Sequence, residues 1–503
     1  MNRNENFFNH ISDGNTFEGE FLTLGSAILD DKTIKNAFIN IPLKTMNRHG
    51  LIAGATGTGK TKTLQVLAEN LSDKGIPVVL MDVKGDLSGL AQASHGHQKI
   101  EERHQKIGIP FESKAFPVEL MSLSKQNGVR LRATVSEFGP VLISRILDVS
   151  QTQAGIISVI FKYCDDHKLP LLDLKDFKKI LQYATKEGKL EFEESYGRIS
   201  SASTGAILRR IVELEQQGGD LFFGEKSFEV NDLVRLTEDG RGYINIIRLT
   251  DIQDKPKLFS TFMLSLLAEI YESFPEQGDA DKPKLILFID EAHLIFNEAS
   301  KALLNQIESI VKLIRSKGIG LYFVTQNSTD VPESVLSQLG LNVQHALRAF
   351  TAKDRKAIKL AAQNYPDTDF YDTASVLTSL GIGEALVSAL DEKGRPTPLA
   401  ATMMRAPMSR MDILTPTEIN TLLSRSKLVE KYNDSIDRES AYELLNKKIK
   451  QAEAINSQNR TQEQLKKIKR TSRSKYKRQN PIVKVLTSAT FIRAVFGIIK
   501  KVI

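Results

Sequence analysis

The chain has 503 residues, of which 41% are hydrophobic and 26% charged. These proportions allow a large buried core, and the length suggests two or three domains. The only cysteine, Cys164, excludes an intramolecular disulfide bond, as expected in a reducing cytoplasm. The first ten residues are polar and do not resemble a signal peptide. A transmembrane helix needs about 18 consecutive apolar residues, and no apolar run in the chain approaches this length. We therefore expect a cytoplasmic protein without an ordinary membrane span.

The charge of the chain is distributed unevenly. Residues 425–503 contain 20 Lys and Arg against 7 Asp and Glu, so this tail carries about +13. Because the formal net charge of the whole chain is +7, the remainder carries about −6. Any attraction to nucleic acid through bulk charge therefore depends on the tail.

The N-terminal part of the sequence leads into a glycine-rich loop. Short strands and turns are expected between Phe21 and Leu43, and Gly50–Ala53 has the character of the end of a buried strand. The loop follows directly. After it, Lys62–Lys74 has apolar residues at helical spacing.

The loop satisfies the complete Walker A pattern. Its residues are Gly54, Ala55, Thr56, Gly57, Thr58, Gly59, Lys60 and Thr61. The glycines let backbone N–H groups converge on phosphate oxygens, and the dipole of the following helix favours the same anion. In this pattern the Lys60 ammonium bridges the β- and γ-phosphates and the Thr61 hydroxyl binds Mg²⁺. The strand–loop–helix context predicts a site for ATP and Mg²⁺ rather than a merely flexible glycine loop.

Continuous apolar runs predict the strands of a mainly parallel sheet. In chain order these runs are Pro77–Asp82, Gly242–Leu249, Lys284–Asp290, Gly320–Gln326, Val343–Phe350 and Glu384–Leu390. Helical stretches separate them, a pattern typical of a doubly wound α/β fold.

Two parts of the chain differ from this pattern. Residues 91–240 are mostly helical in character, with amphipathic stretches at Gln153–Asp165 and Ser203–Gln216, and we interpret them as an insertion. Beyond Ser424 the sequence is polar and basic, and from Ile482 onward apolar residues alternate with lysine and arginine at helical spacing. The expected domains are a short β-rich segment at 1–45, a P-loop domain at 46–423, a basic linker or helix at 424–480, and an amphipathic basic helix at 481–503.

A second motif lies near the middle of the chain. The run Leu285–Ile289, followed by Asp290 and Glu291, matches a Walker B strand. Such a strand ends at the carboxyl edge of the sheet, where open α/β folds bind ligands. Asp290 is expected to hold Mg²⁺ through water, and Glu291 to activate the attacking water as general base. Gln326 ends another predicted strand and suits a sensor of the γ-phosphate, although an ordinary surface glutamine fits the same position.

Several segments occur together in a characteristic order. They are Arg48–Ala53 before the loop, Asp82–Leu90, Ile289–His293, Thr325–Asn327, and Gln344–Phe350 with Lys353 and Asp354. In these segments the chain resembles the HerA/FtsK superfamily of DNA-pumping ATPases, and above all the bacterial HerA-like proteins. The similarity extends over roughly Phe21 to Arg410.

This resemblance implies a RecA-like core, assembly into a hexameric ring of identical subunits, and ATP-driven translocation on duplex DNA. It also suggests that Arg315 or Arg348 acts in the site of a neighbouring subunit, where it would stabilise charge on the transferred phosphoryl group. Each of these arginines fits equally well as an ordinary surface or ion-pairing residue.

The basic tail has three interpretations. Its lysines and arginines contact DNA phosphates, or they lie on an anionic membrane together with the last helix, or they are solvated while that helix docks on protein. The leading hypothesis is thus a ring motor of the HerA-like class that hydrolyses ATP and translocates on or remodels DNA. The alternative is a membrane-apposed or scaffold ATPase that acts on protein partners. A third hypothesis is a motor that serves a nuclease or another protein partner.

Overall fold

The structure is a computed structural model that describes residues 2–473 except 279, 297–300, 350, 435 and 437. It contains two compact units, Met1–Leu444 and Leu445–Ile503. Helix α18 (Ala441–Arg473) begins in the first unit and forms the described part of the second. The amphipathic helix expected at 481–503 lies outside the described residues. Among the helices that are described, none is both long and apolar enough to cross a membrane.

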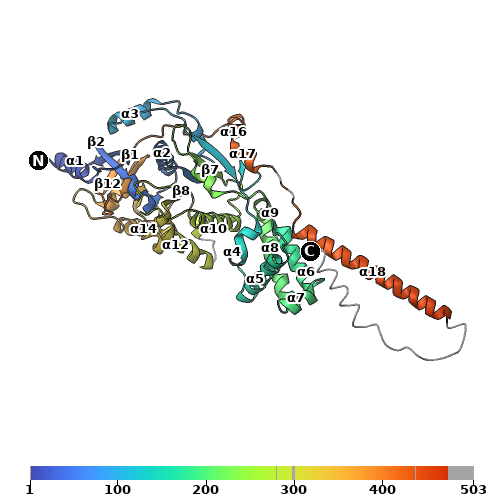
Figure 1. Ribbon diagram of the computed structural model, residues 1–503. Coiled ribbons are helices and arrows are strands. Elements are labelled where there is room, and N and C mark those ends of the chain that lie inside the picture. Colours follow the sequence, from blue (N-terminus) through green and yellow to red (C-terminus); the bar gives the residue numbers. More distant parts are fainter. Residues whose placement is uncertain are drawn as a thin grey trace. The chain divides into compact units, whose positions relative to one another are not determined.

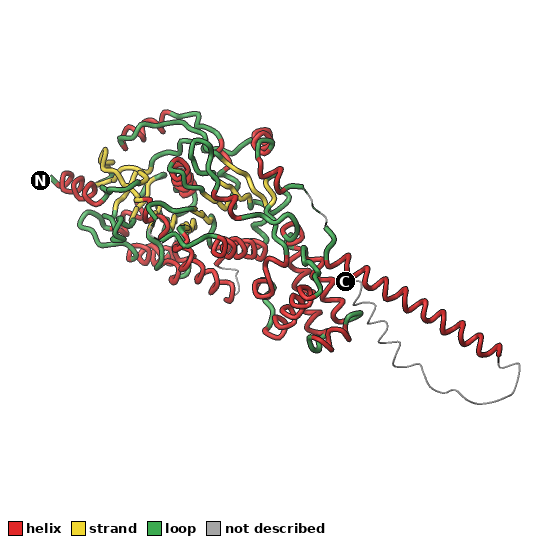
Figure 2. The backbone as a smooth tube through the Cα atoms, viewed as in Figure 1, coloured by secondary structure: helices red, strands yellow, loops and turns green. Residues whose placement is uncertain are grey.

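The first unit is built on a 12-stranded sheet with the order β2-β1-β12-β11-β10-β3-β9-β8-β4-β7-β5-β6 (Figures 1 and 2). The strands are β1 (Phe21–Leu29), β2 (Lys32–Pro42), β3 (Gly50–Ala53), β4 (Val78–Asp82), β5 (Val118–Ser122), β6 (Val129–Arg130), β7 (Ile244–Arg248), β8 (Leu285–Ile289), β9 (Ile319–Thr325), β10 (Leu341–His345), β11 (Glu384–Ser388) and β12 (Ala400–Met404). In this spatial order, the strands from β2 to β10 pair antiparallel with their neighbours, and the strands from β10 to β6 pair parallel. The predicted α/β fold with a mainly parallel sheet is confirmed, and an antiparallel extension is added to it.

Helices cover both faces of the sheet, which explains why its central strands are continuous apolar runs. Successive residues of a strand point to opposite faces. In β9, Tyr322 packs on Phe288 with ring centroids 5.0 Å apart, whereas Phe323 meets Phe296 at 5.5 Å. The first pair belongs to the core shared with α2, and the second lies on the side of α10 and α12, below the strands in Figure 1. The helices are α1 (Arg3–Gly14), α2 (Lys60–Asp73), α3 (Gln98–Ile107), α4 (Val135–Ile146), α5 (Gln151–Asp166), α6 (Leu174–Thr185), α7 (Lys189–Ser195), α8 (Ser201–Gln216), α9 (Gly219–Phe222), α10 (Pro256–Ser273), α11 (His293–Phe296), α12 (Lys301–Ile314), α13 (Glu333–Leu336), α14 (Ala352–Gln363), α15 (Thr373–Ser379), α16 (Pro416–Leu423) and α17 (Lys427–Tyr432).

The N-terminal segment is more than the short β-rich stretch that was expected. It begins with α1, whose buried residues Phe7 and Ile11 join the main core. Its two strands are long, and β1 pairs with β12, so they extend the central sheet instead of forming a separate structure.

The strand predicted at 343–350 is displaced. β10 starts at Leu341 and ends at His345, because the next residue, Ala346, turns to the Walker A loop and its carbonyl accepts a hydrogen bond from the Ala55 N–H at 2.9 Å. The backbone after His345 is thus used to hold the loop rather than to continue the sheet.

The stretch 91–240 contains α3 to α9, as its mostly helical character suggested, and also contributes β5 and β6 to the edge of the sheet. Helices α4 to α9 lie together in Figure 1. The first unit continues past 423 to Leu444 because α17 docks on this region: the Tyr432 hydroxyl donates to the Asp232 carboxylate at 2.6 Å, and the Asn433 amide donates to the Gly128 carbonyl at 2.9 Å.

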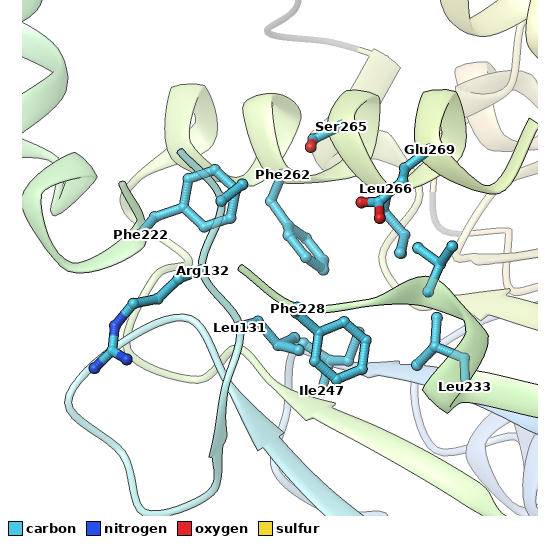
Figure 3. A pocket seen from close by; sticks show the side chains of 12 residues that line it. Leu131, Arg132, Phe222, Phe228, Leu233, Ile247, Phe262, Ser265, Leu266 and Glu269 are labelled. Carbon is cyan, nitrogen blue, oxygen red and sulfur yellow. The ribbon is translucent and has the colours of Figure 1, made fainter. Parts of the chain in front are cut away.

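Figure 3 shows a cavity between this region and α10. Aromatic side chains face it from both sides, and Phe222 and Phe262 lie 6.0 Å apart. Its volume of about 20 Å³ has room for about one water molecule, so it is a packing space rather than a ligand site. At its rim, burial raises the pKa of Glu269 to about 7.

Candidate nucleotide-binding site

The Walker A loop joins β3 to α2 at the carboxyl edge of the parallel strands, between β9 and β10. Gly59 precedes α2 with φ of 119°, a left-handed conformation that favours glycine. No side chain caps this helix, and no acidic residue lies in its first turn. The first amide groups of α2 are therefore oriented toward an anion at the loop, as a phosphate site requires.

Lys60 lies inside the curve of the loop. Its Nζ donates hydrogen bonds to the carbonyl of Gly54 at 2.6 Å and to that of Ala55 at 3.1 Å. Burial, and then the nearby positive charge of Lys84, lowers the pKa of Lys60. A buried ammonium of this kind gains strongly from a phosphate anion, so the residues present fit a nucleotide.

His345, at the end of β10, packs against the Walker A loop and the start of α2. Its Nδ1–H donates to the Glu384 carbonyl at 2.8 Å, and its Nε2 accepts from the Thr63 hydroxyl at 2.9 Å. A Cβ added at Gly54 would lie 2.5 Å from the His345 Cβ, so the two backbones are in close contact. Burial lowers the pKa of His345 to about 4, and the ring is neutral at physiological pH. In the sequence this histidine is marked only by its place in the segment Gln344–Phe350, without a role of its own.

The loop is also held from the side of β11. The N–H of Gly383 donates to the Thr58 carbonyl at 2.9 Å. The guanidinium of Arg103, from α3, donates to the carbonyls of Ile382, Gly383 and Met404 at 3.0 to 3.1 Å. No motif marks Arg103 in the sequence, because its role depends on contacts with residues about 280 positions away.

Asp290 follows β8 and is buried. Its Oδ1 accepts a hydrogen bond from the Glu291 N–H at 2.9 Å, and burial raises its pKa to about 6. The Thr61 hydroxyl lies in the first turn of α2, close to the same sheet edge. Carboxylate and hydroxyl oxygens are the donors that Mg²⁺ prefers, so Thr61 and Asp290 are suitable residues to hold this ion.

Glu291 is the predicted general base. It adopts a φ of 49°, a conformation that is uncommon outside glycine. Its Oε1 forms an ion pair with the Lys84 Nζ at 2.6 Å, and the His293 Nδ1 lies 3.2 Å from its Oε2. Oε2 is buried, and the His293 imidazole is its neighbour among the described residues, although the pair does not have the geometry of a hydrogen bond. Glu291 is therefore held between Lys84 on one oxygen and His293 on the other.

The other predicted residues lie at exposed positions. Gln326 directly follows β9, the strand between the Walker A and Walker B strands, so the fold brings it to the edge of the site. Arg315 lies just after α12, and Arg348 follows β10 and donates to the Thr378 carbonyl at 3.4 Å. Lys84 also belongs to this site, and the only sequence signal for it is its place in the segment Asp82–Leu90.

The sequence matches the family model described as "Helicase HerA-like C-terminal" over residues 27–491. The chain belongs to this HerA-like family of P-loop ATPases. Among curated relatives it is 22% identical over 358 residues to the DNA double-strand break repair helicase HerA of Saccharolobus solfataricus, covering 70% of this chain and 64% of that protein. It is 25% identical over 372 residues to the DNA import protein CedB of Sulfolobus acidocaldarius, covering 73% of this chain and 54% of CedB. The HerA-like chain thus spans less than two thirds of these relatives.

Solved structures support the same fold. The bacterial conjugative coupling protein TrwB superposes with a TM-score of 0.52 at 14% identity, covering 81% of this chain and 95% of TrwB. TrwB in complex with ADP and Mg²⁺ superposes with a TM-score of 0.50 at 15% identity, covering 79% of this chain and 99% of that chain. The RecA-like P-loop fold expected from the sequence is confirmed.

Proposed function

We propose that this HerA-like protein binds ATP with Mg²⁺, hydrolyses it, and uses the energy to translocate on or remodel duplex DNA. The observation that carries the hydrolytic step is the Glu291 carboxylate, which is buried beside the Walker B aspartate and paired with Lys84 and His293. A carboxylate at this position, next to the Mg²⁺-binding aspartate, can orient a water and accept its proton once it is released from its ion pair.

The remaining residues have complementary roles in this proposal. Lys60 would neutralise charge on the β- and γ-phosphates, and Thr61 with Asp290 would hold Mg²⁺, which supplies electrostatic stabilisation of the transferring phosphoryl group. Gln326 would contact the γ-phosphate from the neighbouring strand. Each of these roles follows from the position of the side chain at one edge of the sheet.

The DNA substrate is supported by the relatives. One is described as a double-strand break repair helicase and another as a DNA import protein. The charge of about +13 in residues 425–503 adds an attraction for a polyanion that the rest of the chain lacks. A cytoplasmic location stays a prediction, as does the alternative of a scaffold ATPase that acts on protein.

We further propose a hexameric ring in which Arg315 or Arg348 completes the site of a neighbouring subunit. Mixing two inactive variants tests this. An arginine-to-alanine subunit keeps its own Walker A loop, and a Lys60→Ala subunit keeps its arginine, so a mixture should regain part of the turnover if the arginine acts in trans. A mixture that is no more active than its components would remove that arginine from the proposal.

The deciding experiment is steady-state ATP turnover with and without duplex DNA, with Glu291→Gln as control. We expect several-fold stimulation by duplex DNA that is absent from the variant. Turnover that ignores DNA would support ATP hydrolysis but not the DNA motor, and would direct the search to a nuclease, another protein or an anionic membrane as the partner.

A further inference from the structure

Lys84 forms an ion pair with Glu291, the proposed catalytic glutamate of this chain. Its Nζ lies 2.6 Å from Oε1 of Glu291, and only 9% of the Glu291 side chain is exposed. A short, partly buried ion pair between a carboxylate and an ammonium fixes the carboxylate in one position and occupies one of its oxygens. While this pair is intact, the Glu291 side chain is therefore held toward Lys84 and is not free to turn toward a water molecule.

The backbone around Lys84 is fixed, but its side chain is long. The Asp82 carboxylate accepts hydrogen bonds from the N–H groups of Gly85 at 2.7 Å and Asp86 at 3.2 Å, which hold the turn after β4. A Cβ at Gly85 would lie 2.8 Å from the Thr250 methyl group, so this turn is also packed against its neighbour. The ammonium, on a flexible four-carbon stem with 38% of the side chain exposed, can change partner without moving the turn.

Lys84 also faces the phosphate site. β4 is the direct neighbour of β8, so the turn after β4 meets the Walker B carboxylates. Burial disfavours the charge of Lys84, but Asp290, Glu291 and Asp86 outweigh this effect and raise its pKa. Its charge in turn acts on Lys60 within the Walker A loop. The ammonium group of Lys84 is thus close enough to the Walker A loop to act on Lys60, and a terminal phosphate bound at that loop would compete with Glu291 for Lys84.

We propose that Lys84 is a positioning residue that couples the terminal phosphate to the catalytic base: it holds Glu291 when that phosphate is absent and transfers to the phosphate when it is present, which releases Glu291 toward water. This inference rests on the proposed ATP hydrolysis. It is separate from the DNA part of that proposal, because the exchange involves only the nucleotide and two side chains.

The test compares the affinities of ADP and of the non-hydrolysable analogue ADPNP by isothermal titration calorimetry. In Lys84→Met we expect the ADPNP affinity to fall about tenfold while the ADP affinity changes less than twofold, because only ADPNP carries the terminal phosphate. In Glu291→Gln we expect the ADPNP affinity to rise about fivefold, because Lys84 no longer leaves a charged partner. In the double variant that gain should disappear. Lys84→Arg should retain most of the preference for ADPNP.

Lys114→Met is the matched control, since it removes the lysine of a 2.8 Å ion pair with Asp73 that lies outside the site. It should leave both affinities unchanged. Equal losses for ADP and ADPNP in Lys84→Met, or an undiminished gain from Glu291→Gln in the double variant, would overturn the role of Lys84 while leaving ATP binding in place. A wild-type protein that binds neither nucleotide would overturn both this inference and the proposed function.

Discussion

Acidification should destabilise the fold through the histidine beneath the Walker A loop. The His345 ring is buried, its Nδ1–H donates to a carbonyl, and its Nε2 accepts from a hydroxyl, so it cannot take a second proton without losing the Thr63 contact. Burial accordingly lowers its pKa from 6.5 to about 4. Between these two values the unfolded chain binds a proton and the folded chain does not. The contribution of His345 is thus complete above pH 6.5 and is lost progressively as the pH falls toward 4.

The magnitude follows from the two pKa values. At pH 5 the solution is 1.5 pH units below the unfolded-state pKa and still above the folded-state one. At about 1.4 kcal/mol per unit, His345 should reduce the free energy of unfolding by about 2 kcal/mol between pH 8 and pH 5. His49 is a second, independent example, because burial also lowers its pKa to about 4.

The assay is urea unfolding followed by circular dichroism at pH 8, 7, 6 and 5. His345→Gln replaces the ring by an amide that does not titrate. It should cost about 1–2 kcal/mol at pH 8 through a weakened hydrogen bond, but it should lose about 2 kcal/mol less than the wild type on going to pH 5. His49→Gln serves as the comparison, and its free energy of unfolding should likewise depend less on pH than that of the wild type. If His345→Gln lost as much stability as the wild type, the argument from its burial would be wrong.

Three further outcomes are expected. Lys60→Ala should weaken ADPNP binding at least about 100-fold, measured by calorimetry, and a loss below about threefold would contradict its role. Glu291→Gln should retain ADPNP binding while ATP turnover falls about 10²- to 10³-fold, and wild-type turnover would remove it as general base. Gly54→Ala should destabilise the protein by about 2 kcal/mol or more, because its Cβ would lie 2.5 Å from that of His345. Gly57→Ala, whose Cβ meets nothing within 4 Å, should cost about 1 kcal/mol, and equal thermal shifts would refute the contrast.

The central strands and both Walker motifs were predictable because their signals are local. A strand covered on both faces is a continuous apolar run, and β3, β4, β8 and β9 have every residue buried. Helix α1 was not predictable, because the first ten residues of the chain are mostly polar and only Phe7 and Ile11 of this helix are buried. Burial of two residues produces no clear periodicity.

The contacts that organise the site could not be predicted from the sequence, for a different reason. The pairing of Lys84 with Glu291 requires that β4 and β8 be neighbours, although they lie about 200 residues apart. The bond from His345 to the Glu384 carbonyl requires the register in which His345 faces Ala385 across the β10–β11 pair. Both are consequences of strand order and register, which no local pattern specifies.

These contacts place the Walker A loop between two different parts of the sheet. On the parallel side, Lys84 forms an ion pair with Glu291, the proposed general base. On the antiparallel side, Gly383 binds the loop through its N–H, and its carbonyl is held by Arg103 of α3. Gly383 is therefore hydrogen-bonded both to Thr58 of the loop and to Arg103 of α3. The Walker A loop and α3 are therefore connected through two hydrogen bonds on a single glycine, one at its N–H and one at its carbonyl.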